Sequence, residues 1–177
     1  MTTQLRKIIF SLPKRRPTRA VKDEAELFHV TDWPMHYLLA IDRHHVQNMA
    51  RVLQPLDCSP LMWRVLSILA DQDGHNVSEL AELSVIERSN LSKLLDGMER
   101  DGLIARTAPD GDKRKTLIFL ADSGRDLFAR SLPVVLRYYA SFLTGISPSE
   151  MTAFMKVLTR IKSNVKTFDP RDVHGKD

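Results

Sequence analysis

The chain of 177 residues has a single cysteine, Cys58, and no apolar run near the 18 residues that a membrane-spanning helix needs. One cysteine excludes an internal disulfide framework and suits a reducing cytoplasm, where we expect this protein. The sequence also lacks a P-loop, a GxGxxG motif, a nucleophile elbow and any His/Cys spacing typical of a metal site. We therefore predict that the protein is not an enzyme and needs no cofactor, metal or membrane.

Positive charge is present but unevenly placed. The chain has 26 Lys and Arg against 22 Asp and Glu, and residues 1–22 hold seven of the basic residues and no acidic one. The rest of the chain therefore carries a net charge of −3. Residues 1–33 are predicted to be a basic, partly flexible extension, either a tail alone or a tail that also contacts phosphates. DNA binding by the folded part would need a local basic patch.

Hydrophobic periodicity and capping signals predict a mainly helical chain. A first helix is expected over 34–53, capped by Asp32 and ended by Pro55. Ser59 and Pro60 signal the start of a second helix. Long helices are also expected over 122–143 and from Ser147 onward. The last helix has an apolar seam from Met151 to Phe168 with alternating gaps of 3 and 4 residues, typical of a helix that packs along another helix.

The segment between these helices has the element order of a winged helix-turn-helix. Asn76 and Glu79 form a capping pair that opens a short helix. A tight turn and a longer helix over 87–101 follow, and then the stretch TAPDGDKRKTLIFL, residues 107–120, places seven residues of turn and charge between two β-like runs. This order predicts a small β-hairpin wing beside the two helices.

The first half of helix 87–101 is short and polar on the side opposite its apolar residues. Such a helix fits the major groove, where Asn can bind adenine and Lys can reach guanine or phosphate, while the wing tip can enter the minor groove. The predicted DNA contacts are Arg88, Ser89, Asn90, Ser92, Lys93, Lys113, Arg114 and Lys115. The alternative is a solvated polar face, because Asp96, Glu99 and Asp101 would repel phosphate.

Three stretches of the chain share a recognisable pattern: MWRVLSIL, SELAELSVIERSNLSKLLDGMERDGLI and DKRKTLIFLADSG. With them, the chain from about His36 to Val165 resembles the MarR family of transcription regulators. The resemblance implies an obligate homodimer on a palindromic operator, Asp112 orienting Arg114, and release of DNA by a small, often aromatic or phenolic, acid. Two positions depart from the family pattern: Ile86 stands where a polar cap often precedes the recognition helix, and Ala121 stands where Thr is usual.

These observations predict a winged helix-turn-helix DNA-binding lobe over 58–121 and a helical dimerisation lobe over 34–57 and 122–168. His45 lies on the apolar stripe of the first helix, with Asp42 one turn behind it. The two are either a satisfied core pair or, together with Trp63, part of the effector pocket. The alternative functions are a winged-helix module for protein contacts without DNA binding, and a thiol-based redox sensor acting through Cys58.

Overall fold

Residues 29–108 and 116–171 are described in the computed structural model, and they divide into two units after Val135. Each unit is considered by itself. The predicted basic extension lies outside the described residues up to residue 28, as do Asp112, Lys113, Arg114 and Lys115 of the wing tip.

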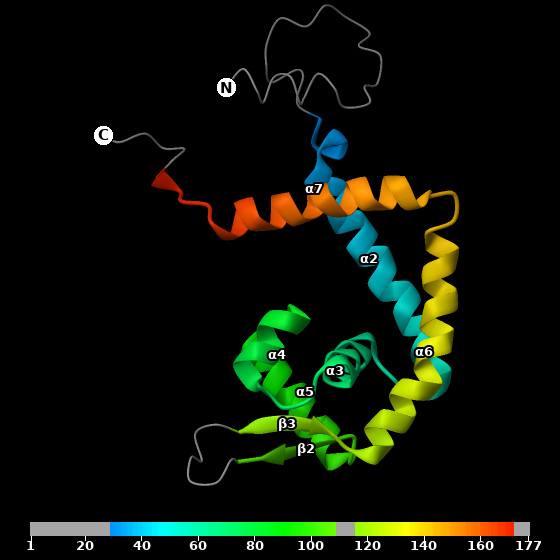
Figure 1. Ribbon diagram of the computed structural model, residues 1–177, viewed down its shortest axis with the longest axis vertical. Helices are drawn as coiled ribbons and strands as arrows, with labels where there is room; N and C mark the ends of the chain where they lie inside the picture. The colour runs from blue at the N-terminus through cyan, green and yellow to red at the C-terminus, as the bar shows by residue number, and fades with distance from the viewer. Residues whose placement is uncertain (1–28, 109–115, 172–177) are drawn as a thin grey trace, which may run out of the picture. The chain divides into compact units, whose positions relative to one another are not determined.

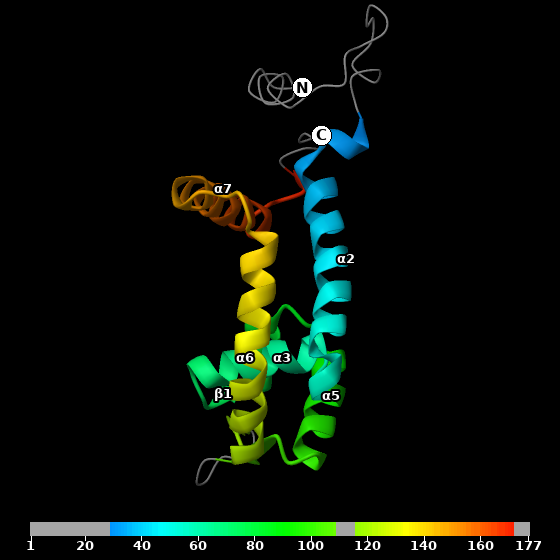
Figure 2. The same cartoon turned by 90° about the vertical axis from the view of Figure 1, so that its right-hand side faces the viewer.

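The first long helix, α2, spans Pro34–Leu53, the predicted bounds (Figures 1 and 2). The predicted cap is wrong: Asp32 is the last residue of a 3-10 turn, η2 (Val30–Asp32), and Trp33 occupies the N-cap position without a side-chain hydrogen bond. A second 3-10 turn, η3 (Gln54–Leu56), contains Pro55 and follows α2 directly. The next helix, α3 (Pro60–Asp71), begins as predicted, with the Ser59 hydroxyl accepting a bond of 3.1 Å from the Met62 amide.

Two further helices, α4 (Val77–Ser84) and α5 (Arg88–Arg100), contact α3 and each other (Figure 1). The predicted capping box of α4 is present. The Asn76 side chain accepts from the Ser78 and Glu79 amides at 2.9 and 3.0 Å, and Glu79 accepts from the Asn76 amide at 3.0 Å. The core that α3, α4, α5 and the sheet share is fully buried at Leu66, Leu69, Leu80, Leu91, Leu95, Met98 and Ile118.

The wing is a small antiparallel sheet of three strands in the order β1-β3-β2. The predicted hairpin consists of β2 (Ile104–Thr107) and β3 (Leu117–Leu120), in a register that pairs Ile104 with Leu120. The short strand β1 (His75–Asn76) was not predicted and pairs with the other edge of β3. Because β1 leads directly into α4, this pairing joins the wing to the helix-turn-helix.

Helix α6 (Asp122–Phe142) continues through Pro133 and crosses the boundary between the two units. In the first unit, Phe128 of α6 stacks on Trp63 of α3, with ring centroids 5.2 Å apart and an angle of 14° between the ring planes. None of the helices in the described ranges is long and apolar enough to cross a membrane.

The second unit contains α7 (Pro148–Lys166), which starts at the predicted capping box of Ser147 and Glu150. None of the residues of α7 is buried within the described chain. Along the predicted seam, Phe154, Val165 and Phe168 are 47%, 68% and 55% exposed. Within this unit, the apolar seam is therefore present and partly uncovered, with Met151, Leu158 and Ile161 half-buried.

Candidate nucleic-acid interface

Helix α5 begins at a carboxylate cap. Glu87 Oε2 accepts bonds of 3.0 and 3.1 Å from the Ser89 and Asn90 amides, and the Ser89 hydroxyl donates to the same oxygen. These hydrogen bonds lower the pKa of Glu87, and the bond from the Ser89 hydroxyl has the largest effect. Ile86, which departs from the polar cap often found at that position in the family, is buried, and the cap of α5 lies one residue later.

The five predicted contacts on α5 share one end of the helix. Arg88, Ser89, Asn90 and Lys93 are exposed, and Ser92 is half-buried with its hydroxyl donating to the Arg88 carbonyl at 3.0 Å. The opposite side of α5 packs into the core, since Leu91, Leu95 and Met98 are at most 1% exposed, while Leu94 beside them is half-buried. The geometry leaves the polar N-terminal half of α5 open to a partner.

Arg106 of β2 neutralises two of the three acidic side chains that weighed against DNA binding, Asp96 and Glu99 but not Asp101. Its guanidinium lies 2.7 Å from Asp96 Oδ1 and 3.1 Å from Glu99 Oε2, and its side chain is 26% exposed. Sequence reasoning missed this residue, although a signal was available. Only residues 101–103 connect α5 to β2, so the strand has to return along the C-terminal half of the helix. These contacts also hold the wing against α5.

The turn between α4 and α5 is strained and anchored from α3. Val85 is β-branched yet adopts φ 54° and ψ 38°, in the left-handed region, and is 80% exposed. Ser84 beside it is fully buried, and its hydroxyl has no hydrogen-bond partner among the described residues. Its carbonyl accepts a bond of 2.9 Å from Arg64 Nη1. Arg64 thereby fixes the end of α4 and the approach to α5.

The three predicted ligand-binding residues differ in their surroundings. Asp42 is exposed, His45 is half-buried and Trp63 is only 7% exposed, with its ring on Phe128. Burial lowers the pKa of His45, the positive charge of Arg64 lowers it further, and Asp42 acts in the opposite direction. The structure thus places His45 near the charge of Arg64, which sequence reasoning did not consider for this site.

Cys58 is a buried thiol, 4% exposed, that donates to the Ser59 carbonyl at 3.6 Å. Burial raises its pKa to about 11, which outweighs the opposing effects of Ser131 and of the Trp63 backbone. The thiolate is the reactive form of cysteine, so this environment does not favour redox sensing.

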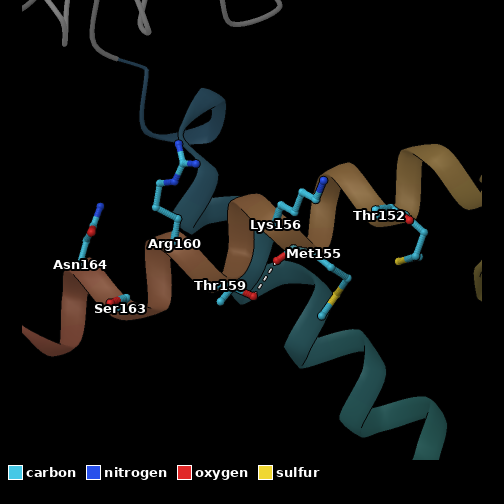
Figure 3. A pocket seen from close by; sticks show the side chains of 8 residues that line it. Thr152, Met155, Lys156, Thr159, Arg160, Ser163 and Asn164 are labelled. Atoms are coloured by element: carbon cyan, nitrogen blue, oxygen red, sulfur yellow. Dashed lines mark hydrogen bonds between the residues drawn. The ribbon is translucent and has the colours of Figure 1, made fainter.

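A shallow hollow lies along α7 (Figure 3). All the residues that line it, from Met151 to Asn164, come from this one helix. The Thr159 hydroxyl donates to the Met155 carbonyl of the same helix. A hollow on one helix face offers no enclosing walls for a small ligand. Within the described ranges, no group of three His, Cys, Asp or Glu side chains could hold a metal ion.

Comparison with known proteins places this geometry among transcription regulators. A model of the MarR family matches residues 59–116. The chain is 24% identical over 140 residues to the HTH-type transcriptional repressor IacR of Pseudomonas putida. That alignment covers 79% of this chain and 84% of IacR. It is 32% identical over 111 residues to the transcriptional activatory protein BadR of Rhodopseudomonas palustris, covering 60% of this chain and 63% of BadR.

Solved structures match over most of the chain. A MarR family regulator from Silicibacter pomeroyi is 27% identical with a TM-score of 0.71, covering 84% of this chain and 99% of that one. The repressor CouR, bound to a 23-mer DNA duplex, is 24% identical with a TM-score of 0.68, over 81% and 99% of the chains. BpsR of Bordetella bronchiseptica is 21% identical with a TM-score of 0.69, covering 76% of this chain and 96% of that one. DNA binding by BpsR is regulated by 6-hydroxynicotinic acid. The last two show the shared fold alone.

Proposed function

We propose that this chain, which belongs to the MarR family of winged helix-turn-helix transcription regulators, binds a palindromic operator as a homodimer. The homodimer leaves the operator when a small ligand binds. The family consists of transcription regulators and not of enzymes. The two relatives named above are a transcriptional repressor and a transcriptional activatory protein. We infer repression for this chain, in the cytoplasm with the DNA that it controls.

The observation that carries DNA binding is the exposed N-terminal half of α5. Arg88 and Lys93 supply positive charge there, while Arg106 neutralises Asp96 and Glu99 further along the helix. An α-helix of this kind fits the major groove and meets base edges with its first residues. Arg114 of the wing, oriented by Asp112, is proposed to enter the neighbouring minor groove.

The partly uncovered seam of α7 supports the homodimer. A contiguous apolar stripe with Phe154, Val165 and Phe168 about half or more exposed is unusual on a monomeric protein. A second copy of α7, related by a two-fold axis, would cover it with the same residues. Two recognition helices related in this way read a palindrome whose half-sites lie about 34 Å, one DNA turn, apart.

For the ligand we propose an aromatic or phenolic acid bound near Asp42, His45 and Trp63. The charge of Arg64 beside His45 suits a carboxylate, and Arg64 also holds the Ser84 carbonyl at the turn before α5. A ligand releases DNA only if it binds one conformation better than another. Competition for Arg64 would supply that difference, since the bound acid would withdraw the anchor of the α4–α5 turn. Regulation of BpsR by 6-hydroxynicotinic acid supports the ligand class.

Fluorescence anisotropy with the promoter of the chain's own gene tests the proposal. We expect tight binding to that duplex, much weaker binding to a scrambled duplex of equal length, and a steep fall of affinity with salt. Lys93→Ala should weaken binding and reduce the salt slope by about 1, whereas Lys156→Ala, which removes an exposed cation of α7, should not. Absence of binding to either duplex would instead favour the protein-contact module.

A further inference from the structure

We propose that Glu87 is a specificity-determining residue that reads the exocyclic amino group of a cytosine in the major groove. The assignment rests on the proposed function, in which α5 enters that groove. Glu87 is not among the contacts that the sequence pattern predicted, and at first sight a carboxylate at a DNA surface is unfavourable because phosphates surround it.

The Glu87 carboxylate has one oxygen in use and one available. All the bonds that it accepts, from the Ser89 amide, the Ser89 hydroxyl and the Asn90 amide, end on Oε2. No described residue donates to Oε1, and the side chain is exposed. The cap therefore holds the carboxylate in a fixed position at the start of α5, while Oε1 stays open to a donor from outside the chain.

The same cap prevents a phosphate from docking at this end of the helix. Free amides at a helix N-terminus commonly bind phosphate. Here the Ser89 and Asn90 amides already donate to Glu87, and its negative charge repels a second anion. Contact between the start of α5 and DNA is then favourable only where Oε1 accepts a hydrogen bond from a base. The donors in the major groove are the amino groups of cytosine and adenine.

The neighbouring serines present acceptors as well. The Ser89 hydroxyl donates to Glu87, and the Ser92 hydroxyl donates to the Arg88 carbonyl at 3.0 Å. A serine hydroxyl has one proton, so each of these oxygens offers only lone pairs to a partner. Glu87, Ser89 and Ser92 thus form an acceptor face at the start of α5, which matches amino groups and not the acceptor atoms O6 and N7 of guanine.

Between the two amino groups, the geometry favours cytosine. Beside its N6 amino group adenine carries the acceptor N7, which repels a carboxylate, whereas the position beside the cytosine amino group is a C–H. Asn or Gln pairs with adenine because its amide both donates and accepts. A carboxylate can only accept hydrogen bonds. Glu87→Gln should therefore lose the preference for cytosine and tolerate adenine at the same position.

Selection of binding sites from a random DNA library tests the assignment, with the full-length chain, Glu87→Gln and Glu150→Gln. Glu150 is the matched control because its carboxylate caps α7 through the Ser147 amide and hydroxyl. We expect the parent and Glu150→Gln to enrich cytosine at the same position of each half-site. Glu87→Gln should lose that preference by about fivefold or more, or shift it to adenine, and keep the other positions. Thermal unfolding by circular dichroism checks that the Gln side chain still caps α5.

A second measurement uses the selected operator with each cytosine replaced in turn by 2-pyrimidinone, which lacks the amino group. The parent chain should lose about fivefold or more in affinity at one position, and Glu87→Gln should lose nothing at that position. Identical base preferences in the parent and Glu87→Gln, with only a uniform change of affinity, would overturn the assignment while leaving DNA binding intact. Failure of the parent to select any sequence would instead remove the proposed function, and this assignment with it.

Discussion

Two glycines in helices should respond to alanine with opposite signs. Gly124 lies in the first turn of α6, where an added Cβ would be 2.1 Å from the Leu103 carbonyl oxygen and 3.1 Å from Leu120 Cδ2. Gly97 lies inside α5, where the nearest atom to an added Cβ is the tip of the flexible Arg100 side chain, at 3.8 Å. Gly124→Ala therefore requires the backbone to move, and Gly97→Ala does not.

The expected magnitudes follow from these distances. An ordinary Cβ contact begins at 3.4 Å, so Leu103 and α6 must separate by about 1.3 Å, which breaks the bond of 3.1 Å from the Ala121 amide to the Leu103 carbonyl. Overpacking costs about 1–3 kcal/mol and the lost bond about 1 kcal/mol, against about 1 kcal/mol gained in helix propensity. Gly124→Ala should lower the free energy of unfolding by about 2 kcal/mol, and Gly97→Ala should raise it by about 1 kcal/mol.

Urea unfolding followed by circular dichroism measures both changes, at one protein concentration because association shifts the apparent stability. In thermal unfolding, the melting temperature should fall by about 4–8 °C for Gly124→Ala and rise by about 2–4 °C for Gly97→Ala. Parent-like stability of Gly124→Ala would refute the packing argument. Operator affinity adds a second result: if DNA passes close to the α5 backbone, Gly97→Ala should weaken binding although it stabilises the fold.

Three further predictions concern the wing, the seam and the first helix. Arg114→Ala should weaken operator binding by about 1–3 kcal/mol in anisotropy titrations with an unchanged melting temperature; full affinity would exclude the minor-groove contact. Light scattering at micromolar protein should give the mass of two chains, because the α7 seam is partly uncovered; a monomer mass would contradict the homodimer. Because the folded-state pKa of His45 is lowered, the unfolded chain binds more protons, and stability should fall as pH drops through 6.5. His45→Gln should reduce that loss, unlike His44→Gln at an exposed neighbour.

Local signals in the sequence determined where most elements begin and end. The capping boxes at Asn76 and Ser147, the break at Pro55 and the strands β2 and β3 depend on residues a few positions apart, so their effect can be worked out from the chain alone. The polar half of α5 was predictable for the same reason, since helical spacing places its apolar residues on one side. The missed cap at Asp32 shows the limit, because a 3-10 turn competed for the same residues.

Only the tertiary structure decided which side chains meet across long separations. Arg106 neutralises Asp96 and Glu99, and Arg64 holds the carbonyl of Ser84 twenty residues away. Likewise, the Leu103 carbonyl makes glycine necessary at position 124. Each of these contacts depends on the distance and angle between two elements, and that geometry is set by the packing of the whole core. The sequence shows which charged and polar groups are available. Whether a given charge is neutralised depends on whether the fold brings a partner within hydrogen-bond distance.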